Sequence, residues 1–271
     1  MEPTTRRPLV TSALFNSTVA FVLAGMLVTT IHEGSHLAAS LLLGHPARLF
    51  PNLVDPGSHI SDRDVILIAG AGPLFSLVTG LLVIWLVKTD TWANGFAKLV
   101  VLWFGFLSAE TGFGYFFVAP IVPNGDTGEV LSLLHAAWYI YAIVFVIGVA
   151  GFGLLLPRLF SRRFSRFVDT KRPFFQLGMW SWLYGTVVLL IIYFFAALTV
   201  SSVVSGSPVI FILVGVATIG IFTPIANFAG GNETVAASES LPLGRPIVGI
   251  VVAAVIAVFI VLVLAHGIHF A

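Results

Sequence analysis

The sequence predicts an all-α fold in which a bundle of helices crosses a membrane several times. Of the 271 residues, 58% are hydrophobic and 9% are charged, whereas about a quarter of a soluble domain is charged. The mean hydropathy is +1.04. Apolar stretches of about 20 residues, the length needed to cross a bilayer, recur along the chain. These properties indicate that lipid surrounds most of the protein.

Seven apolar segments satisfy this length, so we expect a polytopic bundle of about seven spans, with six as the alternative if the sixth segment does not cross. Gly44 and Pro46 end the first segment, and Pro157 precedes a basic run. The predicted spans lie near residues 13–43, 64–87, 96–118, 130–157, 178–204, 208–229 and 246–268.

Lysine and arginine are concentrated on one side of these predicted spans. Only Arg48 and Arg63 fall on the other side, and the positive-inside rule therefore predicts a cytoplasmic N-terminus. A secretory signal peptide is the competing interpretation of the first apolar segment. That segment is too long and lacks a small-residue cleavage site, so we expect it to remain as the first span.

The first span contains the most specific motif of the chain, His32-Glu33-Gly34-Ser35-His36. In an α-helix, residues four apart lie on the same face, so both imidazoles can bind one zinc ion. Glu33, the general base of the H-E-x-x-H pattern, would then take a proton from a water molecule that the metal activates. The chain has no cysteine, so any further ligand must be a histidine, a carboxylate or water.

Asp126 is the predicted third ligand. It lies in a segment, 119–128, in which two prolines and two glycines interrupt apolar sequence between the third and fourth spans. Irregular backbone at membrane depth is tolerated where it is buried in protein or lines a polar cavity. The alternative is an interfacial turn with a solvated aspartate. The histidine pair favours the ligand interpretation, and the depth of His32 and His36 in the first span is compatible with it.

Together with the sequence Ala69-Gly70-Ala71-Gly72-Pro73-Leu74, these elements resemble the site-2 protease family of intramembrane zinc metalloproteases. Its members combine a helical H-E-x-x-H, a small-residue G-P element in the next core span and a distant aspartate in a proline-rich, broken segment. Two features differ: the Leu before and the Gly after the aspartate are missing here, and Ser76 stands where many relatives have Asn. Family members also generally hold zinc nearer the cytoplasmic face.

The resemblance implies a zinc metalloendopeptidase that hydrolyses peptide bonds of membrane-embedded substrates, as in regulated intramembrane proteolysis. Zn²⁺ would be held by His32, His36 and Asp126, with Glu33 as the catalytic base. Candidates for supporting the ligands or contacting substrate are Glu110, Asn124, Gly72 and Pro73. For Glu110, which lies within the third span, a water path and a hydrogen bond to a neighbouring helix are both open.

This interpretation divides the chain into three parts. Residues 1–157 form the catalytic membrane core, with the H-E-x-x-H span, the G-P span and the Asp126 loop. Residues 158–177 form a basic cytoplasmic loop, and residues 178–271 form additional transmembrane helices that match no known pattern.

The expected partners are a transmembrane protein or peptide substrate and membrane lipid. Since no soluble domain is present to select substrates, a separate substrate-presenting protein is a further expected partner. The formal net charge of +1 and the short inter-span basic stretches give no sign of nucleic-acid binding. We expect a multi-pass protein of a prokaryotic cell membrane. The alternatives are a transporter or proton- or metal-handling protein, and a non-catalytic zinc-binding membrane scaffold.

Overall fold

The structure is a computed structural model that describes residues 7–87, 95–168, 171–203, 209–229 and 241–271, and helices make up most of it. The α-helices are α1 (Arg7–Leu42), α2 (Asp62–Leu86), α3 (Gly95–Val118), α4 (Asp126–Leu133), α5 (Trp138–Ala150), α6 (Leu156–Phe164), α7 (Lys171–Phe175), α8 (Ser181–Val203), α9 (Val209–Thr218), α10 (Phe222–Ala229) and α11 (Ile247–Leu262). Short π-helical and 3₁₀ segments are η1 (Gly151–Leu155), η2 (Ser165–Phe167), η3 (Gln176–Trp180) and η4 (Leu264–His266). The strands are β1 (Ala47–Phe50), β2 (Leu53–Asp55) and β3 (Ile268–Phe270).

Within the described residues, six helical stretches are long and apolar enough to span a membrane, as expected for an all-α membrane bundle. They are Ser12–Leu42, Asp62–Leu86, Gly95–Val118, Trp138–Phe167, Lys171–Val200 and Ile247–His266. The predicted span at 208–229 consists of two short helices, α9 and α10, on either side of a turn. A seventh crossing therefore stays a prediction, and the described part of that segment is a broken helix.

Two predicted boundaries differ from the structure. The fourth span was expected from residue 130, but it begins at Trp138 because α4 is a separate short helix that ends before it. Most of the basic segment 158–177, expected as a loop, is helical in its described parts. Its helices continue those of the neighbouring spans, since α5, η1 and α6 follow one another without a gap.

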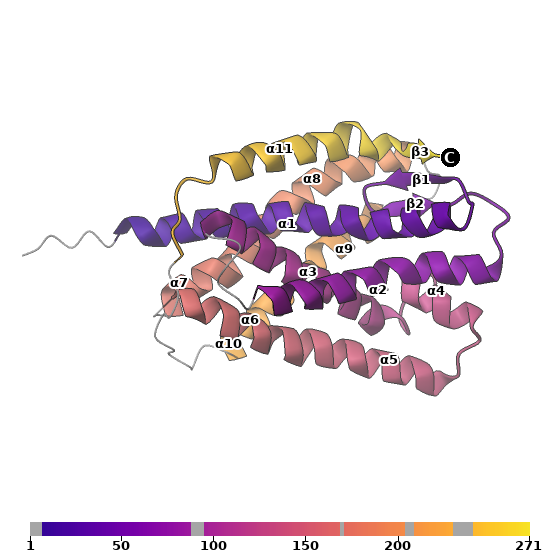
Figure 1. Cartoon of the computed structure of the whole chain (residues 1–271), viewed down its shortest axis with the longest axis horizontal. Helices are drawn as coiled ribbons and strands as arrows, with labels where there is room; N and C mark the ends of the chain where they lie inside the picture. Colours follow the sequence, from indigo (N-terminus) through magenta and orange to yellow (C-terminus); the bar gives the residue numbers. More distant parts are fainter. Residues whose placement is uncertain (1–6, 88–94, 169–170, 204–208, 230–240) are drawn as a thin grey trace, which may run out of the picture.

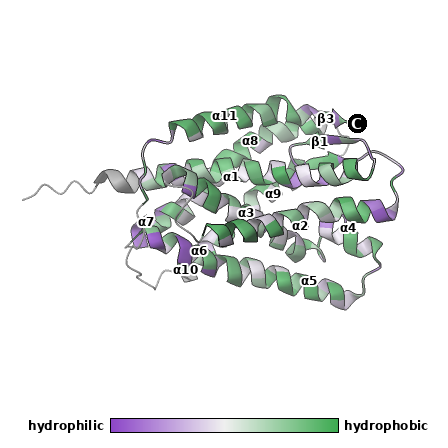
Figure 2. Ribbon diagram, in the orientation of Figure 1, coloured by the Kyte–Doolittle hydropathy of each residue, from purple (hydrophilic) through white to green (hydrophobic). Residues whose placement is uncertain are grey.

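The long helices run side by side along the bundle (Figure 1), and α1 contacts α2, α3, α8 and α11. Hydrophobic residues cover most of their length, with hydrophilic residues gathered toward the two ends (Figure 2). Large apolar side chains lie on the outer surface, including Trp138 (80% exposed), Val248 (77%) and Phe228 (70%). An apolar exterior of this kind is stable when lipid surrounds it.

Helices α2 and α3 approach each other closely because glycine lies at their contacts. A Cβ atom on Gly80 would overlap the backbone of Ala109, and one on Gly112 would lie 2.5 Å from Cβ of Leu77. Small residues allow this approach and are typical of helix contacts in membranes. The contact aligns α2 and α3, which carry several of the groups around the site.

A three-stranded antiparallel sheet, with the order β2-β1-β3, lies beside the C-terminal end of α1 (Figure 1). The pairing joins residues far apart in the chain: Ala47 lies opposite Phe270 and Arg48 opposite His269. The guanidinium of Arg48 also donates a hydrogen bond to the carbonyl of His266 at 2.8 Å. The sequence analysis did not predict this sheet, which ties the segment after α1 to the segment after α11.

Candidate metal centre

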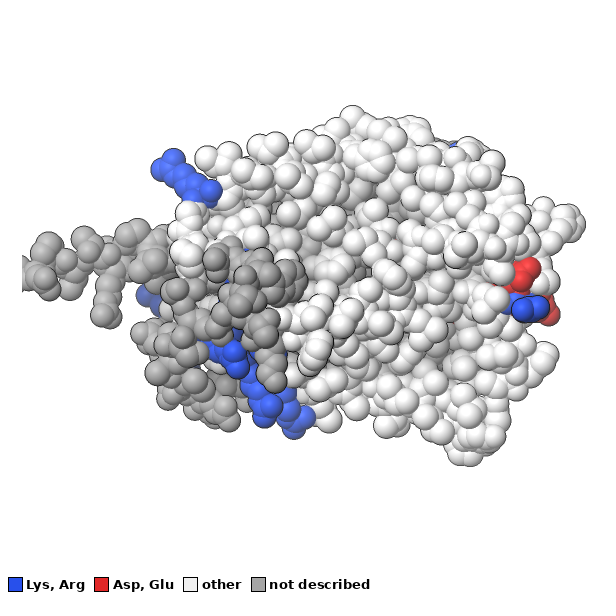
Figure 3. All heavy atoms as spheres, in the orientation of Figure 1, with Lys and Arg blue, Asp and Glu red and all other residues white. Residues whose placement is uncertain are grey.

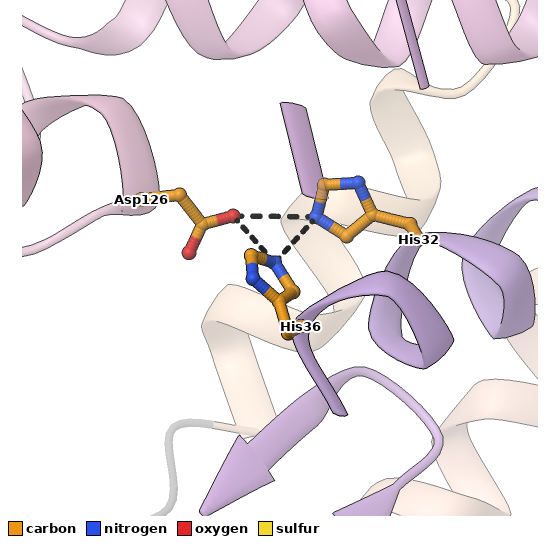
Figure 4. A group of neighbouring side chains, drawn as sticks. All are labelled: His32, His36 and Asp126. Atoms are coloured by element: carbon orange, nitrogen blue, oxygen red, sulfur yellow. Dashed lines mark hydrogen bonds and ion pairs between the residues drawn. The ribbon is translucent and has the colours of Figure 1, made fainter. Parts of the chain in front are cut away.

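Three side chains converge near the C-terminal end of α1 (Figure 4). The Nε2 atoms of His32 and His36 lie 3.2 Å apart. The Oδ2 atom of Asp126 lies 3.2 Å from Nε2 of His32 and 3.2 Å from Nε2 of His36. These three atoms form a nearly equilateral triangle, so the structure brings together the three ligands predicted from the sequence.

Helix α1 supplies both imidazoles and keeps them away from water. His32 is 3% exposed and His36 is 5% exposed. Their spacing of four residues places both rings on one face of the helix. Glu33 is also buried, and its charge interacts with His32, His36 and Asp126. The carboxylate of Glu33 is therefore close to the triangle without belonging to it.

One face of α2 holds both rings through residues 68, 72 and 76, which are spaced four apart. Nδ1 of His36 lies 2.6 Å from the carbonyl oxygen of Ile68, and Nδ1 of His32 lies 2.9 Å from Oγ of Ser76. A carbonyl can only accept, so Nδ1 of His36 carries the proton and the lone pair of Nε2 is directed at the triangle. This contact fixes the tautomer that a metal ligand requires.

Gly72 lies between these two contacts and leaves the space that the rings occupy. A Cβ atom at this position would overlap the imidazole of His36 and lie 2.7 Å from Cε1 of His32. Pro73 follows within the helix, is buried, and donates no backbone hydrogen bond. At Gly72 the G-P element therefore brings bare helix backbone, with no side chain, against the imidazoles of His32 and His36.

Asp126 reaches the triangle from the first residue of α4. Gly125 precedes the helix in extended conformation, and Gly128 packs against the carbonyl of Val122 with no room for a Cβ atom. Burial favours a raised pKa for the Asp126 carboxyl, but the imidazoles of His32 and His36 lower this pKa well below its usual range. The carboxyl is therefore ionised at neutral pH and available as a ligand.

The donor set and its spacing fit a small divalent cation. Zinc binds histidine nitrogen and carboxylate oxygen at about 2.0–2.2 Å, and tetrahedral ligands at that distance lie roughly 3.3–3.6 Å apart. The observed separations of 3.2 Å are close to this value. Two neutral imidazoles and one carboxylate also form a donor set that suits zinc and other first-row transition metals.

Sequence reasoning missed several residues around the site. The ring of Tyr115, on α3, stacks on that of His32 with centroids 5.0 Å apart and an interplanar angle of 9°, and its hydroxyl interacts with the carboxylate of Asp126. Ser76 was noted only as a difference from the family, and the carbonyl of Ile68 carries no side-chain signal at all. The spacing of residues 68, 72 and 76 on one face of a helix that contains the G-P element was the available clue.

Other candidate residues lie elsewhere. Glu110 is buried and accepts hydrogen bonds from the backbone N–H of Gly220 at 2.5 Å and of Phe222 at 3.5 Å. It therefore occupies the break between α9 and α10, which corresponds to the hydrogen-bonded alternative for this residue. Asn124 is exposed in the turn before α4.

A comparison of the chain with family models, curated proteins and solved structures finds no match. The class of site is therefore defined by its own residues: a buried His-His-Asp group, inside an apolar helix bundle, that could hold a metal ion. A carboxylate, Glu33, lies beside it.

Proposed function

We propose that this protein is an intramembrane zinc metalloprotease, similar in its site to the site-2 protease family. The observation that carries the proposal is the convergence of His32, His36 and Asp126 within 3.2 Å of one another, next to the intact Glu33 of the H-E-x-x-H motif. A site that only stored or transported a metal would not need this carboxylate at the base position.

The residues around the triangle favour catalysis over a purely structural metal. A structural zinc site usually has four protein ligands, whereas a catalytic site has three and leaves one position for water or substrate. Three ligand atoms converge in the described part of the chain. When bound, zinc would polarise a scissile carbonyl and lower the pKa of a water molecule to about 7.

The protein side chains then have separate tasks. Glu33 would accept the proton of the attacking water and later donate it to the leaving amine. Ile68 and Ser76 keep the Nε2 atoms of the two histidines directed at the site. Tyr115 holds one ring of the pair and the carboxylate of Asp126 at the same time. Burial of His32, Glu33 and His36 excludes bulk water and strengthens these interactions.

The location of the site within the bundle favours a membrane-embedded peptide as substrate. A helical peptide bond keeps its carbonyl in the i→i+4 hydrogen bond, so the substrate helix would have to unwind before hydrolysis. Substrates with glycine or proline near the scissile bond would unwind most easily. A separate protein that presents substrate remains part of the proposal.

The alternative of a transporter receives some support from the broken helix α9–α10, since discontinuous helices form the binding sites of many transporters. In this chain, however, the backbone N–H groups of the break are directed at Glu110. That carboxylate already occupies the position where a transported anion would bind, so the break favours a structural role.

The test is the metal content and activity of the detergent-purified protein. We expect about one zinc per chain in the parent and loss of zinc in His36→Ala and Asp126→Asn. The matched controls are His59→Ala and Asp55→Asn, which change exposed residues and should retain zinc. Glu33→Gln should retain zinc but lose cleavage of a reconstituted single-span peptide with Gly and Pro at its centre. Absence of zinc in the supplemented parent would refute the proposal.

A further inference from the structure

The two ends of the bundle differ strongly in charge (Figure 3). At one end, the N-terminal part of α1 meets the start of α3, helices α6 and α7, and the segment before α11. Lys98, Arg163 and Arg166 lie together around one small pocket with Val87 of the α2 terminus, and Asn16 of α1 donates a hydrogen bond to the carbonyl of Gly244. The described basic residues of this basic end are Lys98, Arg158, Arg162, Arg163, Arg166, Lys171, Arg172 and Arg245.

The candidate metal centre lies toward the opposite end. His36 is six residues before Leu42, the last residue of α1, which corresponds to about 9 Å along the helix axis. His32 follows Ser12, the start of the apolar stretch, by 20 residues, or about 30 Å. Asp126 belongs to the connection between α3 and α5 at this end. Arg48 and Arg63 are the basic residues that the structure describes here.

Aromatic side chains fill the interior next to the basic end, beginning with α6 itself. Trp103, Phe106, Phe160 and Phe164 are 0% exposed, and their ring centroids lie 4.0–6.2 Å apart within this cluster. Close packing of this kind leaves few voids larger than a water molecule. The side chain of Asp126, in contrast, is 27% exposed, against 4% for His32 and 7% for His36. The metal centre thus opens on the side of Asp126, away from the basic end.

We propose that the basic end faces the cytoplasm and that the metal centre opens toward the non-cytoplasmic surface. The excess of lysine and arginine on one side sets the orientation of membrane proteins, and this excess lies at the end remote from Asp126. The part of this inference that concerns the substrate rests on the proposed protease function. It states that the scissile bond lies in the half of the bilayer next to the non-cytoplasmic surface. Water enters, and metal is loaded, from that side.

The absence of cysteine makes this orientation directly measurable. Ser58 is exposed in the loop between β2 and α2, at the end of the bundle remote from the basic end, and Ser165, whose hydroxyl lies at the surface, belongs to the basic end. Ser58→Cys and Ser165→Cys form a matched pair that changes no charge. In intact cells of a bacterial host, a membrane-impermeant maleimide should label Cys at 58 at least tenfold more than Cys at 165, and both should react after lysis. The reverse pattern, or equal labelling of both in intact cells, would overturn the proposal.

Two further measurements connect the orientation with the site. An impermeant chelator should remove zinc from right-side-out vesicles and leave it in inside-out vesicles; the opposite result contradicts the proposal. Of two single-span reporters with the same Gly-Pro stretch, only the one with the stretch in the non-cytoplasmic half should show Glu33-dependent cleavage, and preferential cleavage of the other contradicts it. If neither reporter is cleaved and no zinc is found, the proposed protease fails, while cysteine labelling still decides the orientation.

Discussion

Gly72→Ala is the substitution whose effect can be worked out most directly from the structure. The new Cβ atom would overlap the His36 imidazole and lie 2.7 Å from Cε1 of His32. To reach an ordinary contact of 3.4 Å, the His32 ring would have to retreat by about 0.7 Å, whereas ligand distances in a functional metal site vary by only about 0.2 Å. We therefore expect Gly72→Ala to lower zinc affinity at least 100-fold, and overpacking to destabilise the fold by roughly 1–3 kcal/mol.

The matched control is Gly70→Ala, two residues earlier in the same helix. Its Cβ atom would meet only Cγ2 of Val130 at 3.8 Å, an ordinary contact. Both changes replace glycine by alanine and raise helix propensity by the same amount, up to about 1 kcal/mol. Zinc affinity is measured for both variants by competition with a chromophoric chelator in detergent. Equal zinc affinity in Gly72→Ala and Gly70→Ala would refute the close packing of α2 on the histidine pair.

Three further predictions concern Ser76 and Tyr115, which contact His32, and Glu110, which lies at the break between α9 and α10. Ser76→Ala removes the partner of Nδ1 of His32 and should lower zinc affinity about 10- to 100-fold, whereas Ser40→Ala, another buried serine, should leave it unchanged in the same titration. Tyr115→Phe keeps the stack on His32 but loses the hydroxyl, so the visible spectrum of the Co²⁺-substituted protein should shift less than in Tyr115→Leu; equal shifts would contradict the stacking role. Glu110→Ala leaves the N–H groups of Gly220 and Phe222 without their acceptor, and thermal unfolding should show a loss of about 1–3 kcal/mol or more, with zinc stoichiometry unchanged.

The group of residues that could hold a metal could be predicted because each member has a strong local signal. The H-E-x-x-H spacing and the helical period place His32 and His36 on one face, and the Pro- and Gly-rich interruption marks the segment of Asp126. Most span boundaries follow equally directly from apolar length, since the edge of a span is set by composition. The start of α5 at Trp138 was missed because the second half of α4 contains Val130, Leu131 and Leu133, which extend the apolar signal toward the N-terminus.

The supporting groups could not be predicted because tertiary contacts define them. Every residue has a backbone carbonyl, so the sequence does not distinguish that of Ile68. Only the packing of α1 on α2 brings this carbonyl to His36. Tyr115 is one of many aromatic residues in apolar sequence, and only the packing of α3 against α1 stacks its ring on His32. Strands of three or four residues give almost no periodic signal, and β1 pairs with a segment more than 200 residues away.

The pairing of β1 with β3 has a consequence for biosynthesis. Strand β1 directly follows the helix that carries both histidines, and β3 is the last element in chain order that the structure describes. During translation, the first span enters the membrane long before its sheet can be completed, because the partner strand β3 lies more than 200 residues later in the chain. The surroundings of α1 therefore become complete only after α11, the last helix before β3, has been synthesised. Under the proposed function, the site would not be fully formed while the spans between β1 and β3 are still being synthesised.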